Sequence, residues 1–186
     1  MKAALFALLL AFGGSSLAAQ EVCRQALALG LDVSGSVDAR EYLLQLNGLA
    51  AALDSGAVRG ALLEQPEAPV EILVYEWSGP ADQVTLLPWT RITDAAALDA
   101  AVELLGGLER REGATPGTAL GVAMLHGARM LEQRNQCWRK TLDISGDGKS
   151  NLGPRPRSVK PQLEGTGITI NALVIGADDP AIGDRR

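Results

Sequence analysis

The fold is decided by a stretch near the N-terminus, Leu27-Ala28-Leu29-Gly30-Leu31-Asp32-Val33-Ser34-Gly35-Ser36. Its apolar run predicts a buried strand, because parallel strands that are covered on both faces read as continuous hydrophobic sequence. Asp32, Ser34 and Ser36 follow at a two-residue spacing, which in extended backbone directs all three side chains to one side. Gly35 then allows a sharp bend into a helix. One carboxylate and two hydroxyls form an oxygen cluster of the kind that a small divalent cation prefers.

The first 19 residues have the layout of a secretory signal peptide. Met1-Lys2 gives a positive start, residues 3–12 are apolar, and residues 13–19 are small, with cleavage expected after Ala18 or Ala19. The alternative is a membrane anchor, but about ten apolar residues fall short of the roughly 20 that span a bilayer. The sequence therefore predicts an exported protein, periplasmic or secreted, with no stable membrane insertion after cleavage.

The remaining chain has the length of one domain with a single core. We expect this domain to span residues 20–176 and a disordered tail to follow over residues 177–186. The formal net charge of −5 argues against a phosphate-binding surface, so we expect no nucleic-acid partner.

Strands and helices alternate along this domain. The periodicity predicts strands over residues 24–31, 70–77, 83–89, 138–144 and 168–175, helices over 38–53, 95–108 and 118–134, and short helical turns near 62–63 and 159–163. Asp38 and Glu41 have the spacing of a capping box, and Pro88 places its strand at a sheet edge, in an antiparallel hairpin with the strand before it. The pattern indicates an α/β fold, a Rossmann-like open sheet that is mostly parallel, with one antiparallel edge strand and helices on both faces.

The only two cysteines, Cys23 and Cys137, precede Asp32 and Asp147 by nearly the same distance along the chain. If both acids end neighbouring parallel strands, both cysteines lie side by side at the opposite ends of those strands. In an exported protein this spacing predicts one disulfide; the alternative is two separate buried thiols.

Three segments with oxygen-bearing side chains are expected where strands end or helices begin, residues 32–36, 117–121 and 145–148. In an open α/β sheet, ligands bind beyond the carboxyl ends of the strands, where the strand order reverses. Placing the strands of Asp32 and Asp147 on either side of that point brings two carboxylates together, and such a pair repels unless a cation separates it. Each segment alone is typical of an ordinary turn or helix cap, so the argument depends on their combination.

These motifs resemble those of a von Willebrand factor A-type domain, whose metal-ion-dependent adhesion site is matched by Asp32-x-Ser34-x-Ser36. The chain is similar in particular to an uncharacterised family of exported bacterial proteins of this fold. The segments that carry this similarity include Trp77-Ser78-Gly79, Gly117-Thr118-Ala119-Leu120-Gly121, Cys137-Trp138-Arg139 and Asp143-Ile144-Ser145-Gly146-Asp147-Gly148.

The resemblance implies one set of metal ligands, made of Asp32, Ser34, Ser36, Thr118 and Asp147. Thr115 is the alternative for the role of Thr118. The implied cation is Mg²⁺, or else Mn²⁺ or Ca²⁺, with one coordination position that an acidic group of a protein partner completes. The implied function is metal-dependent protein binding of the adhesion or assembly type.

A domain of this type normally continues with a sixth strand and a closing helix. The fifth strand expected here ends near residue 175 of 186. We therefore expect a fold truncated after that strand, which leaves the strand as an uncovered edge.

We do not expect an enzyme. A serine nucleophile needs a base, and the single histidine, His126, falls within a predicted helix, away from the strand ends. The alternatives are a metal-assisted hydrolase and a structural exported domain without a functional metal. Asp143 is interpreted as an acid held by structural hydrogen bonds; a role in orienting the site is its alternative.

Overall fold

A computed structural model describes residues 22–175, so the predicted signal peptide and tail lie outside the described residues. The elements follow in the order β1 (Cys23–Asp32), α1 (Ala39–Asp54), α2 (Gly56–Leu63), β2 (Val70–Trp77), β3 (Gln83–Ile92), α3 (Ala95–Gly106), α4 (Leu120–Glu132), β4 (Cys137–Gly146), α5 (Pro156–Leu163) and β5 (Ile168–Val174). The strands agree closely with the sequence prediction. The helices α2 and α5 are longer than the short turns expected there.

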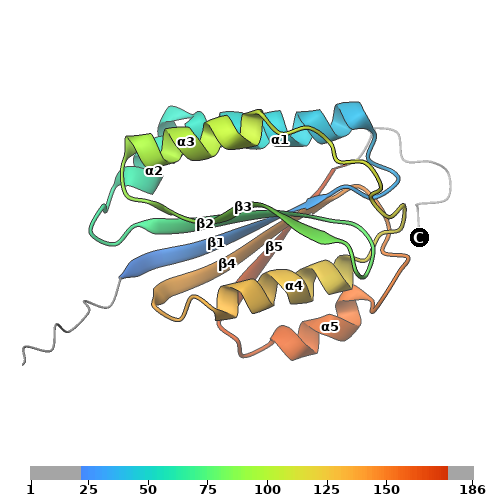
Figure 1. The fold of residues 1–186 in the computed structure, drawn as a ribbon. Coiled ribbons are helices and arrows are strands. Elements are labelled where there is room, and N and C mark those ends of the chain that lie inside the picture. Colours follow the sequence, from blue (N-terminus) through green and yellow to red (C-terminus); the bar gives the residue numbers. More distant parts are fainter. Residues whose placement is uncertain (1–21, 176–186) are drawn as a thin grey trace, which may run out of the picture.

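The strands form a single sheet in the order β3-β2-β1-β4-β5 (Figure 1). β1 is parallel to both of its neighbours, β5 is parallel to β4, and β3 is antiparallel to β2. The prediction of a mostly parallel sheet with one antiparallel edge strand is therefore confirmed. Because β1 lies at the centre and ends at Asp32, this acid lies at the carboxyl edge of the sheet.

Helices α1, α2 and α3 cover one face of the sheet, and α4 and α5 cover the other (Figure 1). Helix α1 begins with the expected capping box, in which the backbone N–H of Glu41 donates to Asp38 at 2.8 Å and that of Asp38 donates to Glu41 at 2.9 Å. Its buried side recurs at helical spacing through Tyr42, Leu46 and Leu53. Burying each of these side chains contributes roughly 1.5–3 kcal/mol, so α1 is anchored beside the end of β1.

Helix α4 approaches the opposite face closely because Gly127 has no side chain. A Cβ there would lie 2.6 Å from Leu142 and 2.7 Å from the hydroxyl of Tyr75. That hydroxyl donates to the main-chain oxygen of Ala123 at 2.9 Å. These contacts fix the helix against the sheet and hold its first turn near the carboxyl ends of the strands.

β5 is the second edge of the sheet and pairs only with β4 within residues 22–175. Leu173 and Val174 are 65% and 80% exposed. Between α1 and the strands β4 and β5 runs a mostly apolar groove of about 930 Å³, to which Leu44 and Leu173 contribute. The edge position expected for the fifth strand is confirmed.

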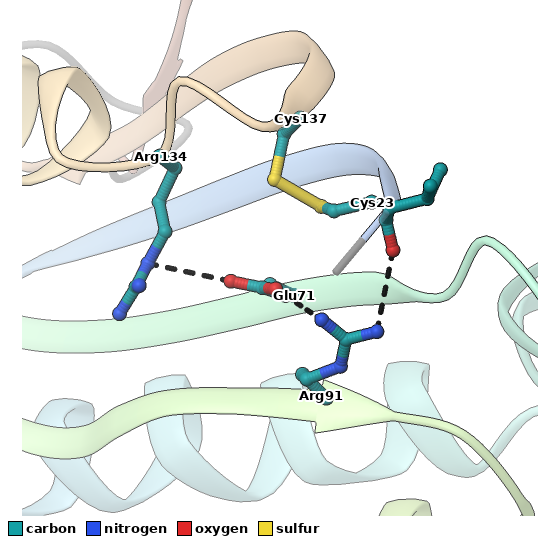
Figure 2. The surroundings of a disulfide bond; sticks show 6 residues. Cys23, Glu71, Arg91, Arg134 and Cys137 are labelled. Atoms are coloured by element: carbon teal, nitrogen blue, oxygen red, sulfur yellow. Dashed lines mark hydrogen bonds and ion pairs between the residues drawn. A yellow bond between two sulfur atoms is a disulfide. The ribbon is translucent and has the colours of Figure 1, made fainter. Parts of the chain in front are cut away.

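Cys23 and Cys137 form a disulfide at the amino ends of β1 and β4, which confirms the sequence prediction (Figure 2). Beside it, the buried carboxylate of Glu71 pairs with Arg91 at 3.2 Å and with Arg134 at 3.3 Å (Figure 2). The two sulfurs and Glu71 lie within metal-binding distance of one another, but the sulfurs are bonded together and two guanidinium groups already neutralise the carboxylate. The disulfide therefore ties β1 to β4, and the ion pairs of Glu71 tie β2 to β3 and to the segment that follows α4.

No helix in the described range has both the length and the apolar character needed to cross a lipid bilayer.

Candidate metal centre

Three loops meet beyond the carboxyl ends of β1 and β4, and each is a connection between two elements. The first loop (residues 33–38) joins β1 to α1, the second loop (residues 107–119) joins α3 to α4, and the third loop (residues 147–155) joins β4 to α5. The strand order reverses between β1 and β4, so the loops converge at the position where open α/β sheets bind ligands.

The first loop turns back immediately after β1. The backbone N–H of Ser34 donates to Oδ1 of Asp32 at 2.8 Å, and the N–H of Val37 donates to the main-chain oxygen of Ser34 at 3.0 Å. The sequence predicts extended backbone from Asp32 to Ser36, and the structure shows a turn in that segment instead. The oxygens still converge, because the turn brings the hydroxyls of Ser34 and Ser36 within 3.2 Å of each other.

Gly35 serves a close approach between loops. Its N–H donates to the main-chain oxygen of Pro116 at 3.0 Å, and a Cβ at Gly35 would lie 3.0 Å from that same oxygen. A larger residue would push the second loop away from the first. The sequence had indicated only a bend for this glycine.

The third loop brings the second carboxylate to the cluster. The hydroxyl of Ser36 donates to Oδ1 of Asp147 at 2.6 Å. Next to it, a Cβ at Gly146 would lie 3.1 Å from Oδ2 of Asp32, so this glycine leaves space for that carboxylate. The structure thus brings Asp32, Ser34, Ser36 and Asp147 together in one continuous group of oxygens.

The second loop contributes Thr118, whose side chain is 4% exposed. Its backbone is held by Asn151, which accepts from the Thr118 N–H at 2.8 Å and donates its own N–H to the Thr118 oxygen at 2.9 Å. A Cβ at Gly148 would lie 3.5 Å from the Thr118 hydroxyl and 3.4 Å from that of Ser36. The two hydroxyls therefore flank the same small space.

Thr115, the alternative to Thr118, is held elsewhere. Its backbone N–H donates to Asp82 at 2.7 Å, and its methyl carbon would lie 2.6 Å from a Cβ at Gly79. The structure therefore brings Thr118, and not Thr115, to the other oxygens.

The carboxylate of Asp32 is only partly satisfied by the described residues. Asp32 is completely buried, and its Oδ2 accepts no hydrogen bond from the described residues. Burial raises the pKa of Asp32, and the nearby charge of Asp147 adds to that shift, whereas hydrogen bonds from Ser34 and from the main-chain N–H of Asp147 oppose it. A buried carboxylate oxygen without a partner is costly, and a cation removes that cost. Two carboxylates and three hydroxyls are the donor types that hard divalent cations accept.

The hydroxyl side of the cluster opens into a pocket of about 600 Å³, to which Ser36, Thr118 and Asp147 contribute together with Lys149. A group from outside the chain can therefore approach these three residues directly.

Gln45 on α1 and Asn151 in the third loop support the cluster, and neither was identified from the sequence. Gln45 donates to the main-chain oxygen of Asp32 at 3.2 Å, and the Ser145 hydroxyl lies 3.2 Å from its Oε1. Glutamine and asparagine are common on helices and in turns, so the sequence holds no signal for these roles.

Asp143 and His126, two candidates from the sequence for roles at the site, lie outside the cluster of oxygens. Asp143 accepts a hydrogen bond from Asn171 at 2.6 Å, which fits the interpretation of a structurally held acid. His126 lies in α4 with its ring centroid 5.0 Å from that of Tyr75, and burial lowers its pKa, with the charge of Arg129 adding to the shift. Its contacts are those of a packing residue.

Solved structures share this fold. Proximal thread matrix protein 1 from the mussel byssus, with a zinc-occupied MIDAS motif, is 18% identical at a TM-score of 0.62, with 84% of this chain and 39% of that chain covered. A von Willebrand factor type A protein from Catenulispora acidiphila is 18% identical at a TM-score of 0.58, with 81% and 33% covered. The pilus adhesin SpaC from Lactobacillus rhamnosus GG is 16% identical at a TM-score of 0.62, with 88% and 26% covered.

The match to these structures thus spans between 26% and 39% of their own lengths, and at such identities it shows a common fold. A comparison with curated proteins finds no match. A family model described as "Protein of unknown function (DUF1194)" matches residues 22–184, an interval that contains both cysteines and all five residues predicted to bind metal. The chain has a von Willebrand factor A-type fold, and it belongs to the DUF1194 family.

Proposed function

We propose that this protein is a metal-dependent protein-binding module of the adhesion or assembly type. A divalent cation, Mg²⁺ or else Mn²⁺ or Ca²⁺, would be held by five residues, Asp32, Ser34, Ser36, Thr118 and Asp147. The observation that carries the proposal is Oδ2 of Asp32, a buried carboxylate oxygen that has no hydrogen-bond partner among the described residues and lies beside a second acid.

The same charges indicate what the bound cation would recognise. Asp32 and Asp147 together match the charge of a divalent ion, and the hydroxyls of Ser36 and Thr118 add neutral oxygens on the side that opens into the pocket. A hard cation prefers a further oxygen ligand, and an anionic one is attracted most strongly. The proposed partner is therefore a protein that presents a carboxylate.

The proposal includes a binding role without catalysis. The single histidine, His126 in α4, packs against Tyr75 of β2, so the serines of the first loop are not paired with it as nucleophile and base. The names of two structural relatives, an adhesin and a byssal matrix protein, agree with a role in binding. We also propose export to the periplasm or the medium, in keeping with the disulfide, since such bonds persist in oxidising compartments.

The proposal is tested by thermal unfolding of the protein after treatment with a chelator and after addition of millimolar Mg²⁺, Mn²⁺ or Ca²⁺. A ligand that binds only the folded state must raise Tm, by an amount that grows with its concentration. We expect a rise in the native protein and none in Asp32→Ala. The matched control is Asp143→Asn, which removes a nearby carboxylate outside the cluster and should retain the response.

A flat response to all three cations would favour a structural domain without a functional metal. Metal-dependent hydrolysis of generic ester or phosphoester substrates that disappears in Asp32→Ala would favour a hydrolase. In the cation-bound protein, chelator-sensitive binding of a peptide that contains aspartate, but not of its asparagine counterpart, would support the carboxylate-binding role.

A further inference from the structure

Two adjacent arginines in the second loop reach toward different parts of the structure around the candidate metal centre. The guanidinium of Arg110 donates to the main-chain oxygens of Val33 at 3.4 Å and Val37 at 3.1 Å. These two carbonyls lie on either side of Ser34 and Ser36 in the first loop. Arg110 therefore holds the backbone of the first loop without touching a predicted ligand atom.

Arg111 connects the same loop to the end of β2. Its guanidinium forms ion pairs with Glu76 at the end of β2 and with Asp82 in the turn between β2 and β3. Glu76 is 1% exposed and also accepts from the hydroxyl of Tyr42 at 3.2 Å. A buried carboxylate of this kind needs a charged partner, so the position of Arg111 is strongly constrained.

Asp82 extends these contacts along the second loop. One of its oxygens accepts from the N–H of Thr115 at 2.7 Å and from the hydroxyl of Ser78 at 2.5 Å. Burial works to raise the pKa of Asp82, but these hydrogen bonds and that from Arg111 outweigh it and lower the pKa. Asp82 is thus held ionised, in the form that accepts all of these bonds.

The part of the second loop that Glu76 and Asp82 hold, residues 111–115, leads directly to Thr118. The oxygen of Pro116 accepts from the N–H of Gly35 at 3.0 Å, and the N–H of Ala119 donates to the oxygen of Ser78 at 2.8 Å. The second loop is therefore fixed to the first loop on one side and to the end of β2 on the other.

We infer that Arg110 and Arg111 are positioning residues that set the separation between the hydroxyls of the first loop and that of Thr118. Charge-assisted hydrogen bonds are stronger than neutral ones, and the rigid guanidinium fork binds two acceptors at once. Arg110 holds the second loop to the first loop, and Arg111 holds it to the end of β2. Together they align the loops before a cation binds. The inference rests on the proposed metal-binding function and adds to it the residues that hold the ligands in place.

Two variants remove these contacts. Arg110→Met removes the donors to the first loop. Glu76→Gln/Arg111→Met removes the Arg111 cation together with the charge of Glu76, so that the fully buried Glu76 is not left as an unpaired carboxylate. Asp82 loses Arg111 but keeps its hydrogen bonds from Ser78 and Thr115. The matched control is Arg59→Met, because Arg59 also bridges two carboxylates, but between α1 and α3, away from the three loops.

The measurements are Mn²⁺ affinity by titration calorimetry and backbone hydrogen exchange without metal. We expect about tenfold weaker Mn²⁺ binding in each loop variant, the scale on which residues that orient metal ligands act. We also expect at least roughly tenfold faster exchange at the N–H groups of Gly35 and Ala119, because their hydrogen bonds open locally before global unfolding. The Arg59 variant should change neither quantity.

Loop variants that bind Mn²⁺ as tightly as the native protein would overturn the inference, even if exchange at these two N–H groups became faster. If the native protein itself bound no Mn²⁺, Mg²⁺ or Ca²⁺, the proposed function would fail. The arginine contacts would then be judged by hydrogen exchange alone, and native rates at Gly35 and Ala119 in both variants would show that they do not fix the loops.

Discussion

Ser36 donates a hydrogen bond of 2.6 Å to the carboxylate of Asp147, which lies 111 residues further along the chain. This bond gives Asp147 a partner within the protein, whereas Oδ2 of the buried Asp32 has none among the described residues. The two acids of the candidate metal centre differ in burial: Asp32 is completely buried, whereas Asp147 is partly exposed. We therefore expect the charge of Asp32 to be the more costly of the two when no cation is bound.

Asp32→Asn should abolish the Tm increase caused by cations and raise the Tm of the metal-free protein. The amide keeps an oxygen that accepts from the Ser34 N–H but carries no buried charge. We expect a rise of roughly 3–6 °C, measured by thermal unfolding in chelator. A large loss of Tm would instead mean that the Asp32 carboxylate supports the core.

The stabilisation in Asp32→Asn should depend on pH in a defined direction. The folded protein holds the pKa of Asp32 above its ordinary value of 3.8, so folding favours the protonated carboxyl. The cost of the charge is absent below the ordinary pKa, grows as pH rises through the folded pKa, and is complete above it. The Tm difference between variant and native protein should thus be near zero at about pH 3 and largest near pH 7. A difference that grows toward acid pH would contradict this account.

Thr118→Ala should weaken cation binding, whereas Thr118→Ser should preserve it, because serine keeps the hydroxyl that is the predicted ligand and that lies beside Gly148. We expect a loss of about tenfold or more in Mn²⁺ affinity by titration calorimetry for the alanine variant. Thr115→Ala provides the comparison, since the backbone N–H that binds Asp82 remains and affinity should stay native. Equal losses at both positions would show that Thr118 has no special role.

Gly148→Ala should lower cation affinity with little effect on the metal-free protein. The added Cβ would lie 3.4 Å from the Ser36 hydroxyl and 3.5 Å from that of Thr118, which are ordinary contacts. The change in stability should stay within about 0.5 kcal/mol, as for most surface substitutions. The added methyl group nevertheless fills space between two predicted ligands. Native affinity in a folded variant would place the cation elsewhere.

Cys23→Ser/Cys137→Ser should lower the free energy of unfolding by about 2–5 kcal/mol, measured by urea titration. The bond closes a long loop, with a sequence separation of 114 residues between the cysteines, and it lies at the opposite end of β1 from Asp32. Cation affinity of the folded variant should therefore remain native. A large loss of affinity would show that the disulfide end of the sheet shapes the loops.

Much of this fold could be predicted because each local signal agreed with the tertiary structure. Asp38 and Glu41 start α1, and the apolar run before Asp32 forms the central strand. The helix α2 was underestimated: two glycines, Gly56 and Gly60, weaken its propensity, and its start depends on Ser55, which caps it. The helix α5 was underestimated because Pro156 and Pro161 usually mark breaks, although Pro156 is well suited to a first turn.

Asp32, Ser34, Ser36 and Asp147 converge because the ends of β1 and β4 do, and this convergence can be predicted from sequence with topology rules. Thr118 joins them from the loop between α3 and α4. The contacts of Arg110 and Arg111 could not be predicted in the same way. Their partners, the carbonyls of the first loop and the acids near the end of β2, are far away in the chain, and arginines in a polar loop are usually solvated. Only the folded positions of these groups distinguish the two arginines from other basic residues.

The disulfide between the first residues of β1 and β4 has a consequence for proteolysis. It closes a covalent ring that contains the first and second loops, including the exposed residues Glu112 and Gly113. A single cut by a protease anywhere inside this ring leaves both fragments joined. After such a cut, the two fragments would migrate together as one chain in gel electrophoresis until a reductant breaks the disulfide.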